Sequence, residues 1–390
     1  MRQDRRIARR SRGGGGLLTP GNLSSAERLA AAVALEETGR AVLGHSIDSF
    51  AARYAGISQE AWWFDHAAAD AALVMTFEEL GPWDTCLAFA PGHPLAFALT
   101  APMRVQLPGR DLPPDSPMQF DESEFMTPDD YDLIVEKGYP EFLENFLPRV
   151  GIEPSEVPSA RAEIVRHAQN DAAAWRERGV HLLCATKLRL PFDWFSYARS
   201  LTGFMIDMFE RPKRLIAAMD ATLPVMLDDT LRRLEGSESR GVFLPMARGS
   251  ATFISPAQFE RFCMPGLLLA VERLVEAGYV PILHCDADWT PRLERLLDLP
   301  PRSCILQLDE QTDIRKAKQI LGDHMCLYGN VSPQLLTLGE PDEVKRHCEG
   351  LIEDVGAGGG FILGPACTMP TDAKPENVRA MTQAVHGKGS

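Results

Sequence analysis

Short apolar runs alternate with amphipathic helical stretches from residue 180 to the C-terminus. The runs predict strands over 181–187, 241–246, 280–283, 303–308, 325–328 and 361–363. The stretches between and after them predict helices over 193–208, 212–233, 255–277, 290–299, 312–321, 341–355 and 375–385. Such alternation is typical of a parallel sheet. A closed α/β TIM (β/α)8 barrel is the favoured fold. A doubly wound open sheet is the alternative, disfavoured because no GxGxxG follows the first strand.

The first half of the chain predicts helices and one long loop. Ser24 and Glu27 form a capping box that starts a helix, and an alanine-rich helix covers 59–79. Proline and glycine punctuate 81–130, which predicts a lid-like loop without helices. Helices resume after this loop and continue to about residue 178. We therefore expect a disordered basic arm over 1–23 and a single barrel domain over 24–390. Residues 24–178 of that domain supply the early strands, an N-terminal helical cap and the Pro/Gly-rich loop.

Polar side chains follow the predicted strands at the point where each strand ends. The run 280–283 ends in His284, Cys285 and Asp286. Neighbouring residues of a strand point to opposite faces, so His284 and Asp286 can face the same side while Cys285 points into the barrel wall. The other predicted tips carry Arg248, Asp309, Glu310, Asn330 and Cys367, and Asp288 follows close behind Asp286. In a parallel barrel all of these tips lie at the end that carries the chemistry.

Composition narrows the class of protein. The formal net charge of −14 argues against a nucleic-acid-binding protein, which needs a basic face. No apolar run reaches the length of a membrane helix. The 8 cysteines are dispersed without a CxxC pair, which is typical of reduced thiols in the cytoplasm.

The strand tips and the helices beside them resemble the uroporphyrinogen decarboxylase superfamily. The resemblance covers about the last 150 residues and rests on FISPAQFERFCMPGL, VERLVEAGYVPILHCDAD, LQLDEQTDIRKAKQILG, LYGNVSP and GGGFILGPACTMPTDAKPENVRAM. EFMTPDDYDLIVEKG and PFDWFSYARSLTGFMIDMFERP are similar to a longer branch of the same superfamily. The resemblance implies a TIM barrel. It also implies one of two chemistries, a cofactor-free decarboxylation of a tetrapyrrole or a methyl transfer that depends on methylcobalamin.

The motifs of the decarboxylases themselves are incomplete in this chain. Their N-terminal arginine-rich motif is reduced to Arg40 in ALEETGRAVLGHSIDSF. Their C-terminal GHG-type motif is replaced by Gly364-Pro365-Ala366-Cys367, which lacks the histidine. The chain therefore resembles the methyltransferase branch more closely.

The methyltransferases of the superfamily bind zinc through His-x-Cys on one strand tip and Cys on the last. The matching residues here are His284, Asp286 and Cys367, with Asp286 in place of the second ligand cysteine. The resemblance thus implies that these three residues are both metal ligands and catalytic residues, with a fourth position open. A site with one thiolate in place of two is a harder Lewis acid, which suits oxygen or nitrogen acceptors as well as thiols. A site without metal, in which Asp286 contacts substrate or orients His284, stays open.

The remaining tip residues have both a functional and a structural interpretation. Asp309 is a candidate catalytic acid or base, and Glu310 a candidate substrate ligand or a helix-end charge. Arg248 could hold a substrate carboxylate or form a structural salt bridge. Asp288 is a candidate substrate ligand or a helix cap. Asn330 could contact a substrate amide or stabilise its turn.

The favoured function is a corrinoid-linked methyltransferase. It would move a methyl group between methylcobalamin on a separate corrinoid protein and a small acceptor, either tetrahydrofolate or a thiol such as coenzyme M, with the help of zinc. The alternative is a carboxy-lyase similar to uroporphyrinogen decarboxylase, and a third hypothesis is a non-catalytic binding protein. The resemblance also implies a homodimer.

Overall fold

The structure is a computed structural model that describes residues 23–87, 90–91 and 93–387. The predicted basic arm, but for its last residue, lies outside the described residues. Among those described, no helix is both long and apolar enough to cross a membrane.

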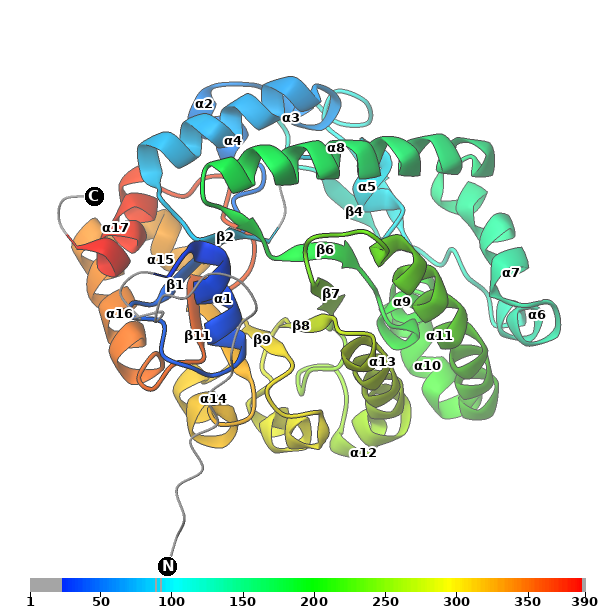
Figure 1. Cartoon of the computed structure of the whole chain (residues 1–390). Coiled ribbons are helices and arrows are strands. Elements are labelled where there is room, and N and C mark those ends of the chain that lie inside the picture. The colour runs from blue at the N-terminus through cyan, green and yellow to red at the C-terminus, as the bar shows by residue number, and fades with distance from the viewer. Residues whose placement is uncertain (1–22, 88–89, 92, 388–390) are drawn as a thin grey trace, which may run out of the picture.

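Parallel strands form a closed barrel at the centre of the molecule (Figure 1). The strands are β1 (Val42–His45), β2 (Thr85–Cys86), β5 (His181–Leu182), β6 (Cys184–Lys187), β7 (Gly241–Pro245), β8 (Val280–Cys285), β9 (Ile305–Leu308), β10 (Cys326–Val331) and β11 (Phe361–Pro365). Their order is β5-β2-β1-β11-β10-β9-β8-β7-β6, and every neighbouring pair is parallel. The two ends of this sheet, β5 and β6, are separated only by Leu183 and form one interrupted run of chain. The nine strands therefore occupy eight positions, which confirms the predicted TIM barrel.

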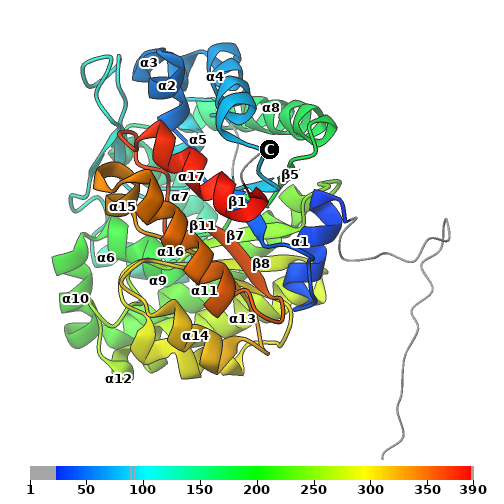
Figure 2. The same ribbon diagram turned by 90° about the vertical axis from the view of Figure 1, so that its left-hand side faces the viewer.

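Helices surround the barrel, as the alternating pattern predicts. In the second half they are α9 (Pro191–Ala198), α10 (Leu201–Glu210), α11 (Pro212–Leu234), α12 (Pro256–Gln258), α13 (Met264–Glu276), α14 (Ile314–Leu321), α15 (Pro333–Leu338), α16 (Pro341–Asp354) and α17 (Pro375–His386). A π-helical turn, Phe259–Cys263, joins α12 to α13, and Thr290–Asp298 is a 3-10 helix. Figure 2 shows α16 and α17 side by side on the outside of the barrel.

The N-terminal half adds a helical cap. Its helices are α2 (Phe50–Ala55), α3 (Gln59–Phe64), α4 (His66–Leu80), α5 (Leu95–Ala98), α6 (Asp129–Lys137), α7 (Tyr139–Phe146) and α8 (Val157–Glu177), with 3-10 turns at Leu147–Val150 and Pro154–Glu156. Cap side chains such as Phe142 and Phe146 belong to the same hydrophobic core as Leu244 and Leu283 of the barrel strands. The cap and the barrel thus share one core.

Helix α1 (Ser25–Val33) covers the N-terminal end of the barrel. The predicted capping box is present, with the Ser24 side chain accepting from the Glu27 backbone N–H. Leu29 and Ala32 of α1 join the cluster of side chains that fills the barrel interior, together with Ile282 and Tyr328. In Figure 1 this helix lies against β1 and β11.

Two predicted helices are interrupted by polar caps. The helix expected over 59–79 breaks at Asp65, whose carboxylate accepts from the Ala68 N–H at 3.0 Å and starts α4. The helix expected over 193–208 breaks at Ser200, whose hydroxyl accepts from the Gly203 N–H and starts α10. In both places a side-chain hydrogen bond satisfies a backbone donor of a new helix.

The expectation of a helix-free loop over 81–130 is wrong in part. The segment contains the barrel strand β2, the short helix α5 and an antiparallel hairpin of β3 (Arg104–Gln106) and β4 (Gln119–Asp121). The strand β2 is too short to leave a clear apolar pattern, and its partners β1 and β5 supply the pairing that sequence spacing cannot indicate. Because this segment follows a barrel strand, it lies at the same end of the barrel as the strand tips.

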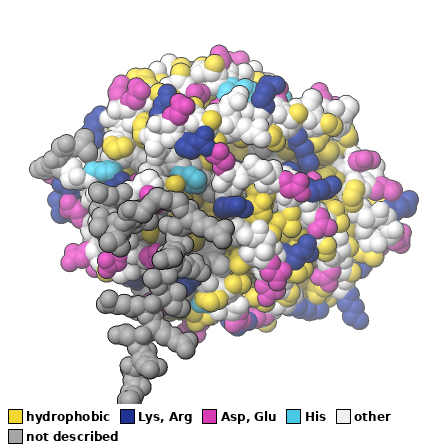
Figure 3. Space-filling model, viewed as in Figure 1, with side chains coloured by type: hydrophobic (Ala, Val, Ile, Leu, Met, Phe, Trp, Pro, Cys, Tyr) yellow, Lys and Arg dark blue, Asp and Glu magenta, His cyan; other side chains and the backbone are white. Residues whose placement is uncertain are grey.

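Charged side chains are mixed over the surface that Figure 3 shows. Among the side chains coloured there, Lys and Arg are interspersed with Asp and Glu. No large basic patch lies on the coloured part of this face, in keeping with the net charge of −14.

Candidate active site at the C-terminal end of the barrel

Strand β8 aims alternate side chains into and out of the barrel. Leu283 and Cys285 belong to the core between strands and helices, whereas Ile282 belongs to the interior cluster. His284 follows the interior direction, and its ring lies 4.9 Å from the ring of Phe243 on the neighbouring strand. The period of two that the sequence predicts is therefore present.

His284, Asp286 and Cys367 meet at the mouth of the barrel. The His284 Nε2 atom lies 3.0 Å from an Asp286 carboxylate oxygen and 3.6 Å from the Cys367 sulfur. The three potential ligand atoms all lie within 4.8 Å of one another. Cys367 follows the end of β11, two residues after Pro365, and is partly exposed, while the other seven cysteines are buried. We call these three residues the mouth triad.

The orientation of His284 is fixed from inside the barrel by Gln307. The Gln307 Oε1 atom lies 2.9 Å from His284 Nδ1, and an amide oxygen can only accept. Nδ1 therefore carries a proton, and Nε2 faces Asp286 and Cys367. This is the arrangement in which a histidine presents a lone pair to a metal.

The three residues of the mouth triad influence one another's protonation. Burial alone would lower the pKa of His284, but hydrogen bonds and charges from Asp286 and Cys367 raise it to about 10. Burial would raise the pKa of Asp286, yet the hydrogen bond and charge of His284 keep it lowered. Without a metal, His284 is thus a cation paired with a carboxylate. A metal cation would take the place of the proton on Nε2.

The donor set suits a catalytic zinc site. An imidazole nitrogen, a carboxylate oxygen and a thiolate are all zinc ligands, and three protein ligands leave a position open for water or substrate. The atoms are already gathered on two strand tips, and the tautomer of His284 is set by a hydrogen bond. The residues present therefore fit the metal.

Arg248 is engaged in a structural ion pair. Its guanidinium donates to both carboxylate oxygens of Glu122, at 2.7 and 2.6 Å, and lies 4.4 Å from the centre of the Tyr197 ring. Its backbone N–H donates to the buried Asp193 at 3.0 Å. This pairing connects the loop after β4 to the loop after β7. The salt-bridge interpretation of Arg248 therefore describes the structure.

The other predicted residues lie on tips around the triad and mostly make local contacts. Asp288 accepts from the Thr290 N–H at 2.8 Å, at the start of the 3-10 helix, and Asp309 accepts from the Gln311 N–H at 2.9 Å. Asn330 lies inside β10 and donates to the backbone carbonyls of Asp309 and Thr312. Glu310 is exposed. Asn330 thus joins two strand tips, and the Asp309 carboxylate stays half-exposed beside them.

Several residues near the triad were not predicted from the sequence. They are Gln307, Asp193, Tyr197, Lys187 and Arg189. Burial raises the pKa of Asp193 to about 6, although the Arg248 N–H and the charges of Arg189 and Arg248 oppose that rise. Lys187 ends the predicted strand over 181–187, so its place at a strand tip was the signal that could have identified it.

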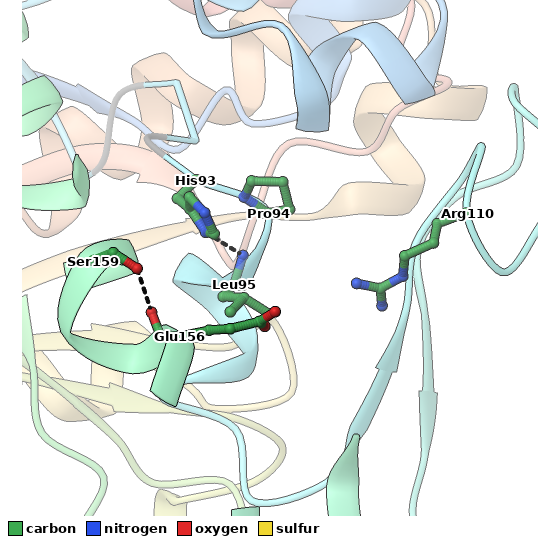
Figure 4. A pocket seen from close by; sticks show the side chains of 6 residues that line it. All are labelled: His93, Pro94, Leu95, Arg110, Glu156 and Ser159. Atoms are coloured by element: carbon green, nitrogen blue, oxygen red, sulfur yellow. Dashed lines mark hydrogen bonds between the residues drawn. The ribbon is translucent and has the colours of Figure 1, made fainter. Parts of the chain in front are cut away.

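A separate surface pocket lies on the cap (Figure 4). It has a volume of about 360 Å³ and is lined by His93, Pro94, Leu95, Arg110, Glu156 and Ser159. In Figure 4 the Arg110 side chain extends from the opposite side of the pocket toward Leu95 and Glu156, and none of the lining residues belongs to the barrel strands. This pocket is distinct from the mouth triad.

Comparisons with known proteins agree on the family and the fold. The family model for uroporphyrinogen decarboxylase (URO-D) matches residues 177–388. A uroporphyrinogen decarboxylase of Pseudoalteromonas translucida is 33% identical over 202 residues, which are 50% of this chain and 56% of that protein. One of Methylococcus capsulatus is 32% identical over 114 residues, or 29% of this chain and 32% of that protein. The matched region thus spans 32% to 56% of the length of these relatives.

A solved structure extends the similarity to almost the whole chain. It is a methyltransferase from Methanosarcina mazei, with a TM-score of 0.66 and 17% sequence identity, covering 94% of this chain and 99% of that one. At this identity the likeness establishes the fold. With the matched family model covering more than half of the chain, this protein belongs to the uroporphyrinogen decarboxylase (URO-D) family.

Proposed function

We propose that this protein is a methyltransferase that moves a methyl group between methylcobalamin on a partner corrinoid protein and a small acceptor. The observation that carries the proposal is the mouth triad, in which His284, Asp286 and Cys367 converge within 4.8 Å. A cofactor-free decarboxylation does not need such a ligand set. The methyltransferase fold neighbour supports the same branch of the family.

Each residue of the triad would have a defined role. His284 presents Nε2 because Gln307 holds the opposite nitrogen, Asp286 supplies a hard oxygen, and Cys367 supplies one thiolate. Bound zinc would lower the pKa of an acceptor thiol and hold the thiolate as a nucleophile. Methylcobalamin on the partner would supply the methyl group to the acceptor sulfur or nitrogen, and the electron pair of the cobalt–carbon bond would remain on cobalt. Asp309, half-exposed at the next tip, would accept a proton from an acceptor nitrogen.

The acceptor is a thiol such as coenzyme M or a pterin such as tetrahydrofolate. A ligand set with only one thiolate leaves the metal harder than a set with two, which favours a nitrogen acceptor. Asp286 is thus the residue that tilts the proposal toward the pterin.

Metal analysis of the purified protein tests the ligand set. Under reducing conditions we expect about one equivalent of zinc per chain in the wild type and almost none in His284→Ala or Cys367→Ala. Cys285→Ala is the matched control, because this neighbouring cysteine points into the core and should leave the metal in place. A wild-type protein without metal, or loss of metal in Cys285→Ala alone, contradicts the site.

Methyl transfer itself is followed through the colour of the corrinoid. The zinc-loaded protein should convert free methylcobalamin in the presence of a thiol or tetrahydrofolate, and Cys367→Ala should not. Absence of conversion with every acceptor and with added corrinoid proteins would contradict the methyltransferase assignment.

The second candidate is a decarboxylase, favoured by the names of the curated relatives. It predicts release of carbon dioxide from a porphyrinogen by metal-free protein. The incomplete decarboxylase motifs, with Arg40 alone at the N-terminal side and no histidine in Gly364–Cys367, weigh against this substrate.

A further inference from the structure

Two cationic side chains at the barrel mouth lack an acidic partner. Lys187 is the last residue of β6, and Arg189 follows two positions later in the loop, where its charge acts on Asp286 of the triad. Within the described part of the chain, neither forms an ion pair, although salt bridges are common elsewhere in the structure. Both are half-buried. An unpaired, half-buried cation calls for an explanation, because its desolvation is not offset by an opposite charge.

The Lys187 ammonium shares an aromatic neighbour with the mouth triad. Its Nζ atom is 5.2 Å from the centre of the Phe97 ring and 5.8 Å from that of Phe243. The same Phe243 ring lies 4.9 Å from the His284 ring. The two aromatic faces hold the lysine stem, and no hydrogen bond from its Nζ to a described residue is present. Its three donors are therefore free of described partners beside Phe243, the ring that packs on His284.

Arg189 lies on the Tyr197 ring, with its guanidinium carbon 4.7 Å from the ring centre. Arg248 lies on the same ring at 4.4 Å, but its guanidinium is already bound to Glu122. Arg189 donates only from Nε, to the Thr100 carbonyl at 3.3 Å, among the described residues. Its two terminal amino groups remain available. Arg248 is thus neutralised by Glu122, whereas Arg189 has no acidic partner among the described residues.

The nearest acids do not satisfy these cations. The charge of Lys187 acts on Asp48, and that of Arg189 on Asp193, but neither acid comes within the 4.0 Å of an ion pair. Burial raises the pKa of both acids, which disfavours their negative charge. The charge of Arg189 also acts on Asp286, but this carboxylate already bonds to His284 and forms no ion pair with Arg189 among the described residues.

We propose that Lys187 and Arg189 form an anion-binding subsite that holds the carboxylate or sulfonate group of the small acceptor beside the mouth triad. The assignment of the ligand as the acceptor rests on the proposed function; the subsite itself rests on the two cations. A guanidinium and an ammonium can donate together to the oxygens of one anionic group, and such charge-assisted hydrogen bonds are strong when partly desolvated. The aromatic rings behind each cation limit screening by water.

Small anions without a reactive group test the subsite independently of metal and methyl transfer. Ethanesulfonate and propionate are titrated into chelator-treated protein, and binding is followed by ligand-observed NMR. Their neutral isosteres, ethanesulfonamide and propionamide, should bind at least about tenfold more weakly, as expected for loss of charge-assisted hydrogen bonds. A preference for ethanesulfonate would indicate a sulfonated thiol as the acceptor, and a preference for propionate a carboxylated one.

Variants of the two cations locate the binding. Lys187→Met and Arg189→Met should each weaken anion binding by about tenfold or more, while Lys187→Arg should retain most of it. Arg240→Met is the matched control, because Arg240 also lies on a tyrosine ring, at 5.6 Å from Tyr279, but at the opposite end of the barrel. Thermal melting curves establish that each variant is folded, and Lys187→Arg keeps the test valid should a methionine variant unfold.

The outcomes separate this inference from the proposed function. Equal affinity of wild type, Lys187→Met and Arg189→Met for both anions, or no binding by the wild type at tens of millimolar, would overturn the subsite. Anion binding that depends on both cations, in a protein that neither holds zinc nor transfers methyl groups, would support the subsite and overturn the methyltransferase function instead.

Discussion

Gln307 controls which nitrogen of His284 faces the mouth of the barrel. It is fully buried, accepts from Nδ1, and its own amide nitrogen has no hydrogen-bond partner among the described residues. A buried donor without a hydrogen-bond partner lowers the stability of the folded state. A role in positioning His284 explains why a glutamine is present here despite that cost.

Removing this acceptor should weaken metal binding without removing a ligand. We expect Gln307→Leu to lower zinc affinity about 10- to 100-fold, as is typical for loss of a partner that orients a ligating histidine. Competition with a chromophoric chelator measures the change. Gln307→Glu, which keeps an acceptor at the same place, should restore most of the affinity; equal loss in both variants would contradict a positioning role.

Gly364 makes room for Tyr328 inside the barrel. A Cβ atom at Gly364 would lie 2.3 Å from Tyr328 Cε2 and 2.5 Å from the Gly44 carbonyl oxygen. Neither the fully buried tyrosine nor the neighbouring strand can easily move away.

Adding a methyl group there should destabilise the fold. We expect Gly364→Ala to lower the free energy of unfolding by about 1–3 kcal/mol, measured by urea denaturation. Gly266→Ala is the contrasting substitution, because the nearest atom to its Cβ would be Leu223 Cδ2 at 3.7 Å in a helical segment. It should be neutral or stabilising by up to about 1 kcal/mol. Equal effects of the two substitutions would contradict the crowding argument.

At the scale of single residues, the sequence predicts the triad but not its surroundings. His284, Asp286 and Cys367 could be identified because they stand at strand tips and because the family motif matches them. Glu122, the partner of Arg248, is 126 residues away along the chain, and no local pattern relates the two. Gln307 is one of several polar residues within a predicted strand, and only the register of β8 with β9 pairs it with His284.

Among the helices, α4 and α8 meet through a polar contact. His66 accepts or donates at Nε2 to Asp171 at 3.1 Å, while its Nδ1 lies 3.0 Å from the Pro91 carbonyl oxygen. A carbonyl can only accept, so Nδ1 carries a proton, and the second contact needs one further proton shared between His66 and Asp171. Burial raises the pKa of Asp171 to about 6, partly offset by the charge of His66 and augmented by that of Asp70.

The burial of Asp171 should make stability fall as the pH rises. The unfolded chain releases the Asp171 proton near its ordinary pKa of 3.8, whereas the folded protein keeps it to about pH 6. The folded state therefore binds more protons in this window, and its free energy of unfolding decreases by at most about 3 kcal/mol from this group. Asp171→Asn should thus gain stability relative to the wild type between about pH 4 and pH 6.

Urea denaturation at several pH values measures that difference. Asp323→Asn, an exposed carboxylate on another part of the surface, should show no such trend. The His167 ring lies 3.8 Å from that of His66, and its Nε2 lies 3.7 Å from Glu163. A difference in stability between Asp171→Asn and wild type that does not change with pH would contradict the prediction.

At the scale of elements, the sequence predicts the second half of the fold better than the first. Strands β7 to β11 are short apolar runs between well-capped helices, so their order and direction follow from the pattern. The breaks at Asp65 and Ser200 depend on single capping hydrogen bonds inside otherwise helical stretches. The strand β2 exists because its neighbours pair with it, and this is a property of the barrel rather than of its own residues.

At the scale of the whole molecule, a buried ionic network connects the cap to the barrel helices. Asp207 of α10 accepts from Tyr131 of α6 at 2.9 Å, from Arg199 after α9 at 2.8 Å and from Arg211 before α11 at 3.1 Å. Asp207 is fully buried and Arg199 almost so. The network and the shared hydrophobic core make the cap and barrel one unit.

Loss of the central carboxylate should destabilise that unit as a whole. We expect Asp207→Ala to cost about 3–5 kcal/mol, because it leaves the Arg199 guanidinium buried with its main partner removed. Urea unfolding followed by tryptophan fluorescence and by far-UV circular dichroism should shift together. Asp132 lies on α6 beside Tyr131 and forms an exposed ion pair with Arg214 of α11, so Asp132→Ala should cost less than about 1 kcal/mol. Separate transitions for the two signals would contradict a single unit.

Helix α1 gives the barrel one closed end. Leu29 and Ala32 fill the N-terminal opening, and the mouth triad with Lys187 and Arg189 lies at the other. The acceptor and the corrinoid protein must therefore both reach the triad from the C-terminal end of the barrel. In the proposed reaction, a corrinoid protein bound at the open end would block access to the triad. The small acceptor would therefore bind first, and its methylated product would be released only after the corrinoid protein has dissociated. The closed end of the barrel thus imposes an order on substrate binding and product release.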